Sequence, residues 1–151
     1  MKKVEREQSV VGELTEDDDF FKDLSVQLTF AWESMDVSKV AKFFSKEPNL
    51  MFFDAAPLKY IGWENYEKSS LENFTYRFTH QKFKLYDDMI VRRNGNLAVT
   101  AFTLHLDVTK ADGEKIDTDG RVTFVWEKQG DQWLIVHEHL SIPQVLPPIN
   151  K

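Results

Sequence analysis

The stretch from Gly120 to Ser141, GRVTFVWEKQGDQWLIVHEHLS, is the feature that most constrains the fold of this chain. It predicts two long strands joined by a tight bend at Gln129, Gly130 and Asp131. Successive side chains of a strand point to opposite faces, and here both faces are largely apolar. An antiparallel sheet with one face in water would alternate apolar and polar residues instead. We therefore expect both faces to be covered, one by helices that enclose a pocket and the other by a second subunit.

The composition indicates one compact domain, and neither a nucleic-acid-binding nor a membrane protein. The chain has 151 residues, of which 42% are hydrophobic and 13% aromatic, which is enough for a sizeable core. Its 12 Phe and 4 Trp favour a lined pocket or a buried interface. The net charge of −6 comes without any basic run, and no apolar run approaches the length of a membrane span. With no cysteine and no signal-peptide pattern, the chain is expected to be cytoplasmic.

The predicted elements are helices first and strands afterwards. Residues 1–14 are expected to form a loosely held arm, and residues 15–151 the folded domain. Thr15 is the expected N-cap of the first helix, because the acidic residues 16–19 suit the positive end of a helix dipole. This role explains the acidic run better than metal binding does. Asp36 is expected to cap a second, short helix, and Gly62 to open a third.

Strand patterns follow these helices. The expected strands are residues 49–54, 82–92 and 97–108, followed by the two strands of the terminal ribbon. The pairs Asn94-Gly95 and Asp112-Gly113 are turn signals between them. Three helices followed by a curved antiparallel sheet make an α+β domain in which the helices cover the concave face. Such a cone has an open end that can hold a small molecule.

From about Phe20 to Pro148, the chain resembles the SnoaL-like, nuclear transport factor 2-like (NTF2-like) superfamily. The segments that carry the resemblance are WESMD (32–36), FFD (52–54), Gly62 at the start of the third helix, TFVW (123–126) and WLIVHEHLS (133–141). Within that superfamily the chain most resembles the association, or hub, domain of calcium/calmodulin-dependent protein kinase II, including its exit PQVLP (143–147). The resemblance implies a cone-shaped fold, dimers made through the sheet and, in some relatives, rings of dimers.

The pocket implied by this resemblance departs from those of the relatives. The kinase hub has arginines in its pocket where this chain has Ala101, Phe124 and Leu140, which argues against carboxylate binding of the hub kind. Ketosteroid isomerases place their catalytic base at Asp54, but their oxyanion-hole tyrosine matches Leu28 and their second aspartate falls near residues 122–124. An enolate needs donors where its charge develops, so steroid isomerisation is not expected.

The resemblance and the strand alternation together assign the two faces of the sheet. The expected pocket residues are Trp32, Tyr60, Tyr66, Ala101, Thr103, His105, Phe124 and Leu140. The expected dimer face carries Phe102, Leu104, Arg121, Trp133, Ile135, His137 and His139. Trp32 and the two tyrosines are placed in the pocket because their polar tips can face a ligand. A β-bulge would reverse part of this assignment.

Asp54 and Glu138 are the candidate catalytic residues. Two carboxyl groups in an apolar cone can raise one pKa and form an acid/base pair, whereas a purely structural hydrogen-bonding role is the alternative. His105 can partner Glu138 across the sheet, as a proton shuttle or as a structural pair. The sequence His137-Glu138-His139 looks like a metal motif, but the face of the histidines lacks a third ligand. No metal and no cofactor are therefore expected.

Two functions remain open at this point. The first, which the sequence favours, is a non-catalytic oligomeric module: a homodimer, or a ring of such dimers, with a small and mostly apolar pocket. Its ligand would be an unidentified small hydrophobic or weakly acidic molecule. The second is a small-molecule isomerase, dehydratase or hydrolase that uses Asp54 or Glu138 as acid or base on a hydrophobic substrate.

Overall fold

The computed structural model describes the backbone of residues 2–72 and 77–149, and the side chains of these ranges from residue 16 onward. Its helical elements are α1 (Lys2–Glu33), α2 (Val37–Val40), the 3₁₀ turn η1 (Ala41–Phe43) and α3 (Trp63–Ser70). Its strands are β1 (Met51–Phe53), β2 (Tyr60–Ile61), β3 (Phe78–Leu85), β4 (Ile90–Asn94), β5 (Leu97–Lys110), β6 (Lys115–Gln129) and β7 (Gln132–Ser141). None of the helices in the described ranges is long and apolar enough to span a membrane.

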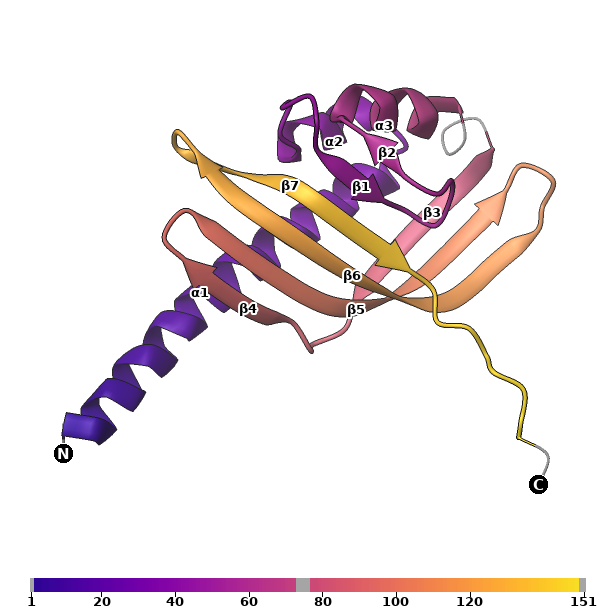
Figure 1. The fold of residues 1–151 in the computed structure, drawn as a ribbon. Coiled ribbons are helices and arrows are strands. Elements are labelled where there is room, and N and C mark those ends of the chain that lie inside the picture. Colours follow the sequence, from indigo (N-terminus) through magenta and orange to yellow (C-terminus); the bar gives the residue numbers. More distant parts are fainter. Residues whose placement is uncertain (1, 73–76, 150–151) are drawn as a thin grey trace.

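The strands form a curved sheet in the order β2-β1-β7-β6-β5-β3, with β4 also paired to β5. Neighbours are antiparallel except for β1, which runs parallel to β7. The predicted terminal ribbon is the hairpin of β6 and β7, whose bend holds Gly130 at a φ of 63°, a conformation that glycine adopts without strain. In Figure 1, α1 crosses behind this sheet, and α3 lies above β1 and β2. The predicted cone-shaped α+β fold is confirmed.

Helix α1 begins much earlier than the predicted N-cap at Thr15. It runs unbroken from Lys2, so the acidic residues 16–19 lie within the helix and not in its first turn. The prediction is wrong because the same local pattern fits a longer helix, and an interior glycine such as Gly12 weakens a helix by only about 1 kcal/mol without ending it. The N-terminal part of α1 extends beyond the sheet in Figure 1. The expected division into a loosely held arm over residues 1–14 and a domain over residues 15–151 stays a prediction.

The other two predicted helix starts are confirmed. The Asp36 carboxylate accepts a hydrogen bond from the Ser38 backbone N–H at 3.0 Å and caps α2. Helix α3 begins after Gly62, which has a φ of 79°. A Cβ at this position would lie 3.2 Å from the Pro48 carbonyl oxygen, so the close approach also favours glycine. The Gly62 N–H donates to the Leu50 carbonyl at 2.6 Å, which ties the start of α3 to the start of β1.

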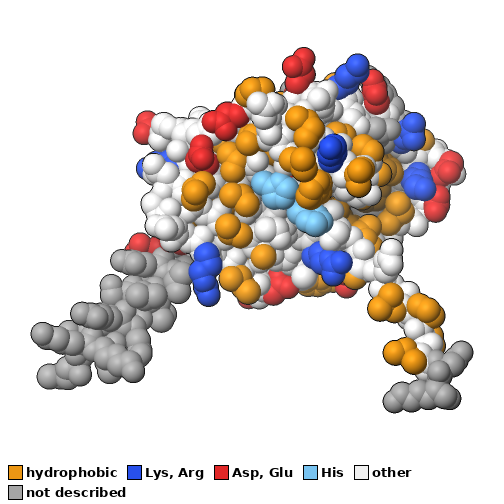
Figure 2. Space-filling view, in the orientation of Figure 1, with side chains coloured by type: hydrophobic (Ala, Val, Ile, Leu, Met, Phe, Trp, Pro, Cys, Tyr) orange, Lys and Arg blue, Asp and Glu red, His pale blue; other side chains and the backbone are white. Residues whose placement is uncertain are grey.

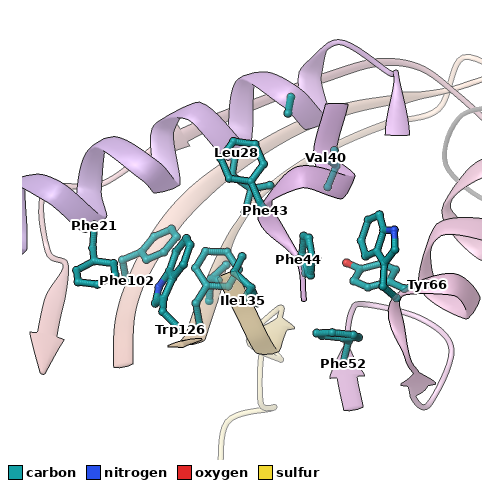
Figure 3. Packing of buried hydrophobic residues seen from close by; sticks show 14 of the residues in the cluster. Phe21, Leu28, Val40, Phe43, Phe44, Phe52, Tyr66, Phe102, Trp126 and Ile135 are labelled. Carbon is teal, nitrogen blue, oxygen red and sulfur yellow. The ribbon is translucent and has the colours of Figure 1, made fainter. Parts of the chain in front are cut away.

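The register of the strands decides which residues face the core. Across β5, β6 and β7, the inward rows are Ala98–Trp126–Ile135, Thr100–Phe124–Glu138 and Phe102–Val122–Leu140. Figure 3 shows Phe21 and Leu28 of α1 above this face of the sheet, and both are buried. Trp126 is fully buried, packs 5.6 Å from the Phe21 ring and donates its Nε1–H to Thr100 Oγ1 at 3.1 Å. Aromatic packing therefore fills one end of the concave face.

Candidate functional site

The other end of the concave face holds a cavity of about 150 Å³, which we call the chamber. Its lining residues are Leu28, Thr29, Trp32, Asp54, Ala55, Tyr66, Phe78, Gln81, Phe83, Phe102, Leu104, Leu106, Val108, Ile116, Val122, Phe124, Glu138, Leu140 and Ile142. Most of these side chains are apolar, and two carboxyl groups, Asp54 and Glu138, are among the few polar ones. An apolar cavity of roughly this volume can hold one aromatic ring.

Strand pairing brings the two carboxyl groups to the same part of the chamber. Strand β1 runs parallel to β7 with Phe52 opposite Glu138, and Asp54 follows β1 directly. The Tyr66 hydroxyl on α3 donates to Asp54 Oδ2 at 2.6 Å, and the Ala55 backbone N–H donates to Asp54 Oδ1 at 2.6 Å. Both oxygens of Asp54 therefore accept a hydrogen bond.

Glu138 is less well satisfied than Asp54. Burial raises the pKa of both groups, and the charge of Asp54 raises that of Glu138 further, to well above its usual value. Hydrogen bonding to Tyr66 partly opposes this effect on the pKa of both groups, and the Ala55 N–H opposes it for Asp54 alone, because these donors stabilise the ionised form. Glu138 is 4% exposed, and its buried Oε2 has no hydrogen-bond partner among the described residues. We therefore expect the charge of the pair on Asp54 and the retained proton on Glu138.

Half of the predicted pocket residues line the chamber. They are Trp32, Tyr66, Phe124 and Leu140. Tyr60 supports the chamber from behind, because its ring stacks on that of Tyr66 at 4.7 Å and its hydroxyl donates to the Ala56 carbonyl at 2.7 Å. Burial and the charges of Asp54 and Glu138 hold the pKa of Tyr66 well above its usual value, so this hydroxyl stays a donor.

The assignment of Ala101 and Thr103 to the pocket is wrong. Phe124 of β6 lies opposite Thr100 and not opposite Ala101, so the even-numbered residues of β5 face the chamber. A shift of one residue in register moves every side chain of a strand to the other face. The β5 residues that line the chamber in their place include Phe102 and Leu104, which the same assignment put on the dimer face.

The expected pairing of His105 with Glu138 is also wrong, for the same reason. His105 lies on the outer face of β5, where its Nδ1 is 2.9 Å from Asp119 and its Nε2 contacts Asp117. Hydrogen bonds to Asp119 and Asp117 raise the pKa of this exposed histidine. The Tyr86 hydroxyl donates to Asp119 at 2.7 Å and completes the cluster.

The prediction that Trp133 and Ile135 lie on the dimer face is wrong, because β7 contains a bulge. The pairing of β6 with β7 shifts so that Trp126 lies opposite Ile135, which leaves Val136 unpaired. Ile135 is consequently buried in the core of its own chain, and Trp133 packs 5.2 Å from the Phe21 ring. Neither residue belongs to the outer face.

The remaining residues of the predicted dimer face do lie on the outer side of the sheet. They are Arg121, His137 and His139. Arg121 Nε donates to Ser141 Oγ at 2.8 Å, and His137 Nδ1 lies 2.6 Å from the Met51 carbonyl oxygen. Within the part of the chain that the structure describes, no group of three or more His, Asp or Glu residues is placed to hold a metal ion.

The wall formed by β3 was predicted only in part. The expected strand 82–92 is two strands, β3 and β4, and both pair with β5. Asp87 and Asp88 interrupt the alternation between them. Phe83 lines the chamber from β3, and its place between Lys82 and Lys84 was the signal for one inward position.

Comparisons with known proteins agree with this architecture. The SnoaL-like domain family matches residues 22–144. An NTF2-like superfamily protein from Salmonella enterica serovar Typhimurium has a TM-score of 0.75 at 24% identity, covering 88% of this chain and 95% of that one. The association domain of CaMKII from C. elegans has a TM-score of 0.66 at 16% identity, with 85% and 98% covered. A candidate dehydratase of the NTF2-like family from Streptomyces avermitilis has a TM-score of 0.74 at 13% identity, with 87% and 99% covered.

No curated protein matches the chain. The structural similarities are similarities of fold, which many unrelated activities share. The family match, in contrast, spans most of the sequence, so the chain belongs to the SnoaL-like domain family.

Proposed function

We propose that this SnoaL-like protein binds a small, mainly hydrophobic molecule in the chamber. The observation that carries the proposal is a largely apolar cavity of about 150 Å³ beside an otherwise well-packed aromatic core. Protein interiors are close-packed, and an empty space of this size costs stability. Ligand sites are typically concave and apolar with a few placed polar groups, as the chamber is.

Filling the chamber tests this proposal. Leu104→Trp adds volume at a buried position that lines the chamber, whereas Thr103→Val alters the neighbouring residue on the outer face. A set of monocyclic aromatic compounds is expected to raise the melting temperature of the wild type and of Thr103→Val, because a ligand that prefers the native state stabilises it. Folded Leu104→Trp is expected to show no such rise. An equal response of all three proteins would contradict binding in the chamber.

We also propose that the module pairs with a second copy through the outer face of its sheet. Rows Val99–Val125–His137 and Ile90–Ala101–Thr123–His139 lie on this face. Three of its apolar side chains are exposed: Ile90 (58%), Leu97 (49%) and Val99 (42%). Figure 2 shows hydrophobic side chains gathered on this side around histidines. A contiguous apolar surface of this kind marks an interaction site more often than a free surface.

Sedimentation tests the self-association. The wild type is expected to sediment as a dimer at micromolar concentration, and Val99→Glu as a monomer, because the new charge would be buried without a partner. Phe30→Glu is the matched control, since Phe30 is 63% exposed on α1, away from this face. A monomeric wild type would overturn the pairing and leave the chamber proposal untouched.

A second candidate function is acid/base catalysis, which the carboxyl pair favours. Asp54 is positioned to accept a proton and Glu138 to donate one inside an apolar site. When the protein is incubated with small cyclic ketones in D₂O, deuterium is expected to enter the ketone at the carbon beside the carbonyl. NMR of the ketone measures this exchange. Asp54→Asn and Glu138→Gln, if folded, are expected to abolish the exchange. Exchange no faster than in buffer, or retained by both variants, would rule out this activity.

A further inference from the structure

The chamber holds two carboxyl groups and no cationic side chain. Its complete lining, within the described residues, contains neither lysine, arginine nor histidine. Buried charges in proteins are normally paired with an opposite charge or neutralised. His105, the cationic residue that the sequence analysis placed in the pocket, lies on the opposite face of the sheet. A positive partner for these carboxyl groups would therefore have to come from outside the chain.

One atom marks where that partner would sit. Asp54 is already served by the Tyr66 hydroxyl and the Ala55 N–H. Glu138 Oε2 is buried and has no hydrogen-bond partner among the described residues, although Glu138 lines the chamber. A buried polar atom without a hydrogen-bond partner is uncommon in folded proteins and calls for an explanation. A donor carried by a ligand in the chamber would satisfy it.

The walls suit a cation with an apolar body. The aromatic residues that line the chamber are Trp32, Tyr66, Phe78, Phe83, Phe102 and Phe124. Aromatic faces attract ammonium groups through their quadrupole and pack against an apolar ring as well. An anionic ligand would be repelled by the carboxylate of Asp54, and no positive side chain lines the chamber to bind it.

We infer that the chamber selects a small primary or secondary ammonium compound with an apolar body of about one ring, whose nitrogen is held by Glu138 and Asp54. This inference rests on the proposed binding function and names its ligand class. The ring fits the chamber volume of about 150 Å³, and the N–H groups of the ammonium supply the donor that Glu138 Oε2 lacks.

Binding of an ammonium is coupled to release of a proton. In the free site, burial and the charge of Asp54 keep the pKa of Glu138 raised. The ionisable groups that act on Glu138 are Asp54 after β1 and Tyr66 on α3, and the charge of Glu138 in turn raises the pKa of Tyr60 on β2. A bound cation favours the charged form of Glu138, so its proton passes to solvent while the ligand stays protonated. The affinity for the amine therefore rises with pH across the range in which free Glu138 is protonated.

Three probes of one size separate the ligand classes: benzylamine as the cation, benzyl alcohol as the neutral analogue and benzoate as the anion. Calorimetry at pH 7 in two buffers of different ionisation enthalpy is expected to show benzylamine binding at least tenfold more tightly than benzyl alcohol. The benzylamine heat is expected to depend on the buffer, which reports the released proton, and benzoate is expected not to bind.

Variants assign the effect to Glu138. Glu138→Gln is expected to weaken the affinity for benzylamine at least tenfold and to change the affinity for benzyl alcohol by no more than about twofold. Glu64→Gln, which removes an exposed carboxyl group on α3, is the control and is expected to change neither affinity. Benzyl alcohol binding as tightly as benzylamine, without proton release, would overturn the inference and keep the hydrophobic chamber. If none of the three binds the wild type, both the inference and the proposed binding function fail. The wild-type series decides the outcome even if Glu138→Gln does not fold.

Discussion

The two ends of the concave face are built from similar residues and differ in how they are filled. At one end Phe21, Trp126 and Ile135 are buried against one another, and the Trp126 N–H has its acceptor in Thr100. At the other end aromatic side chains surround an open chamber, and the buried Glu138 Oε2 has no partner. The same helix, α1, covers both ends: Figure 3 shows its Phe21 beside Trp126 and its Leu28 farther along, and Leu28 lines the chamber. The difference is what the proposed binding function requires: the filled end would supply stability, and the open end would give up packing and hydrogen bonding to hold a ligand.

The largest expected effect is at the filled end. Trp126→Ala removes a fully buried side chain whose neighbours cannot close the space, and is expected to lower the free energy of unfolding by about 3–5 kcal/mol. Urea unfolding followed by fluorescence or circular dichroism measures it. Leu140→Ala, at the wall of the chamber, is the comparison and is expected to cost less, because this side chain already borders empty space. Equal losses would contradict the contrast between the two ends.

Two tyrosine–aspartate hydrogen bonds give the next effect. Tyr66→Phe removes the donor to a carboxylate inside the chamber and is expected to cost about 1–3 kcal/mol at neutral pH. Tyr86→Phe removes the same kind of bond to Asp119 on the exposed face, where water replaces the donor. Urea unfolding of both variants is expected to show a clear loss only for Tyr66→Phe. A comparable loss at Tyr86 would mean that burial does not distinguish the two sites.

Glu138 makes stability depend on pH in a defined direction. Its pKa is raised on folding, so above the unfolded value of 4.5 the native state binds more protons than the unfolded state. Stability therefore falls as pH rises from that value toward the folded pKa, and Asp54 acts in the same direction. Glu138→Gln is expected to remove the part of this pH dependence that Glu138 causes. At high pH the free energy of unfolding of the variant should then rise relative to that of the wild type by about 1.4 kcal/mol for each unit of pKa shift. Parallel wild-type and variant curves of unfolding free energy from pH 5 to pH 8 would refute this.

The smallest effect is expected at the exposed cluster of His105, Asp117 and Asp119. The pKa of His105 is raised by its carboxylate partners, so its contribution is complete below the unfolded value of 6.5 and is lost as pH rises through the folded pKa. Because the cluster is open to solvent, salt screens it. His105→Gln is expected to alter the unfolding midpoint slightly at low salt and not at all in 1 M salt. A salt-independent change larger than that of Glu138→Gln would reverse the ranking of the two clusters.

Local patterns were sufficient to predict much of this fold. The terminal ribbon, the Asp36 cap and the glycine before α3 each depend on residues close in sequence, and the structure has all three. Thr15 shows the limit of such patterns, because whether a helix continues past a capping sequence depends on the residues before it. Asp54 could be identified as a candidate because it falls at the catalytic aspartate of ketosteroid isomerases, and Glu138 because strand alternation places it inside an apolar cone.

Which face each strand residue occupies could not be predicted with the same success. Ala101 and Phe102 exchange places if the pairing of β5 with β6 shifts by one residue, and both alternations look plausible in the sequence. Ile135 is turned inward by a bulge at Val136, which no residue type announces. Both outcomes depend on contacts between segments distant in sequence, so alternation alone does not determine them.

The most direct test of the central claim is the titration of Glu138 in the wild-type protein, followed by NMR of ¹³C-labelled carboxyl groups and assigned with Glu138→Gln. We predict that its resonance titrates well above the ordinary glutamate pKa of 4.5, and that saturating benzylamine lowers the midpoint. A glutamate that titrates in its ordinary range, with no response to benzylamine, would contradict a buried, proton-retaining carboxyl group in a ligand-binding chamber.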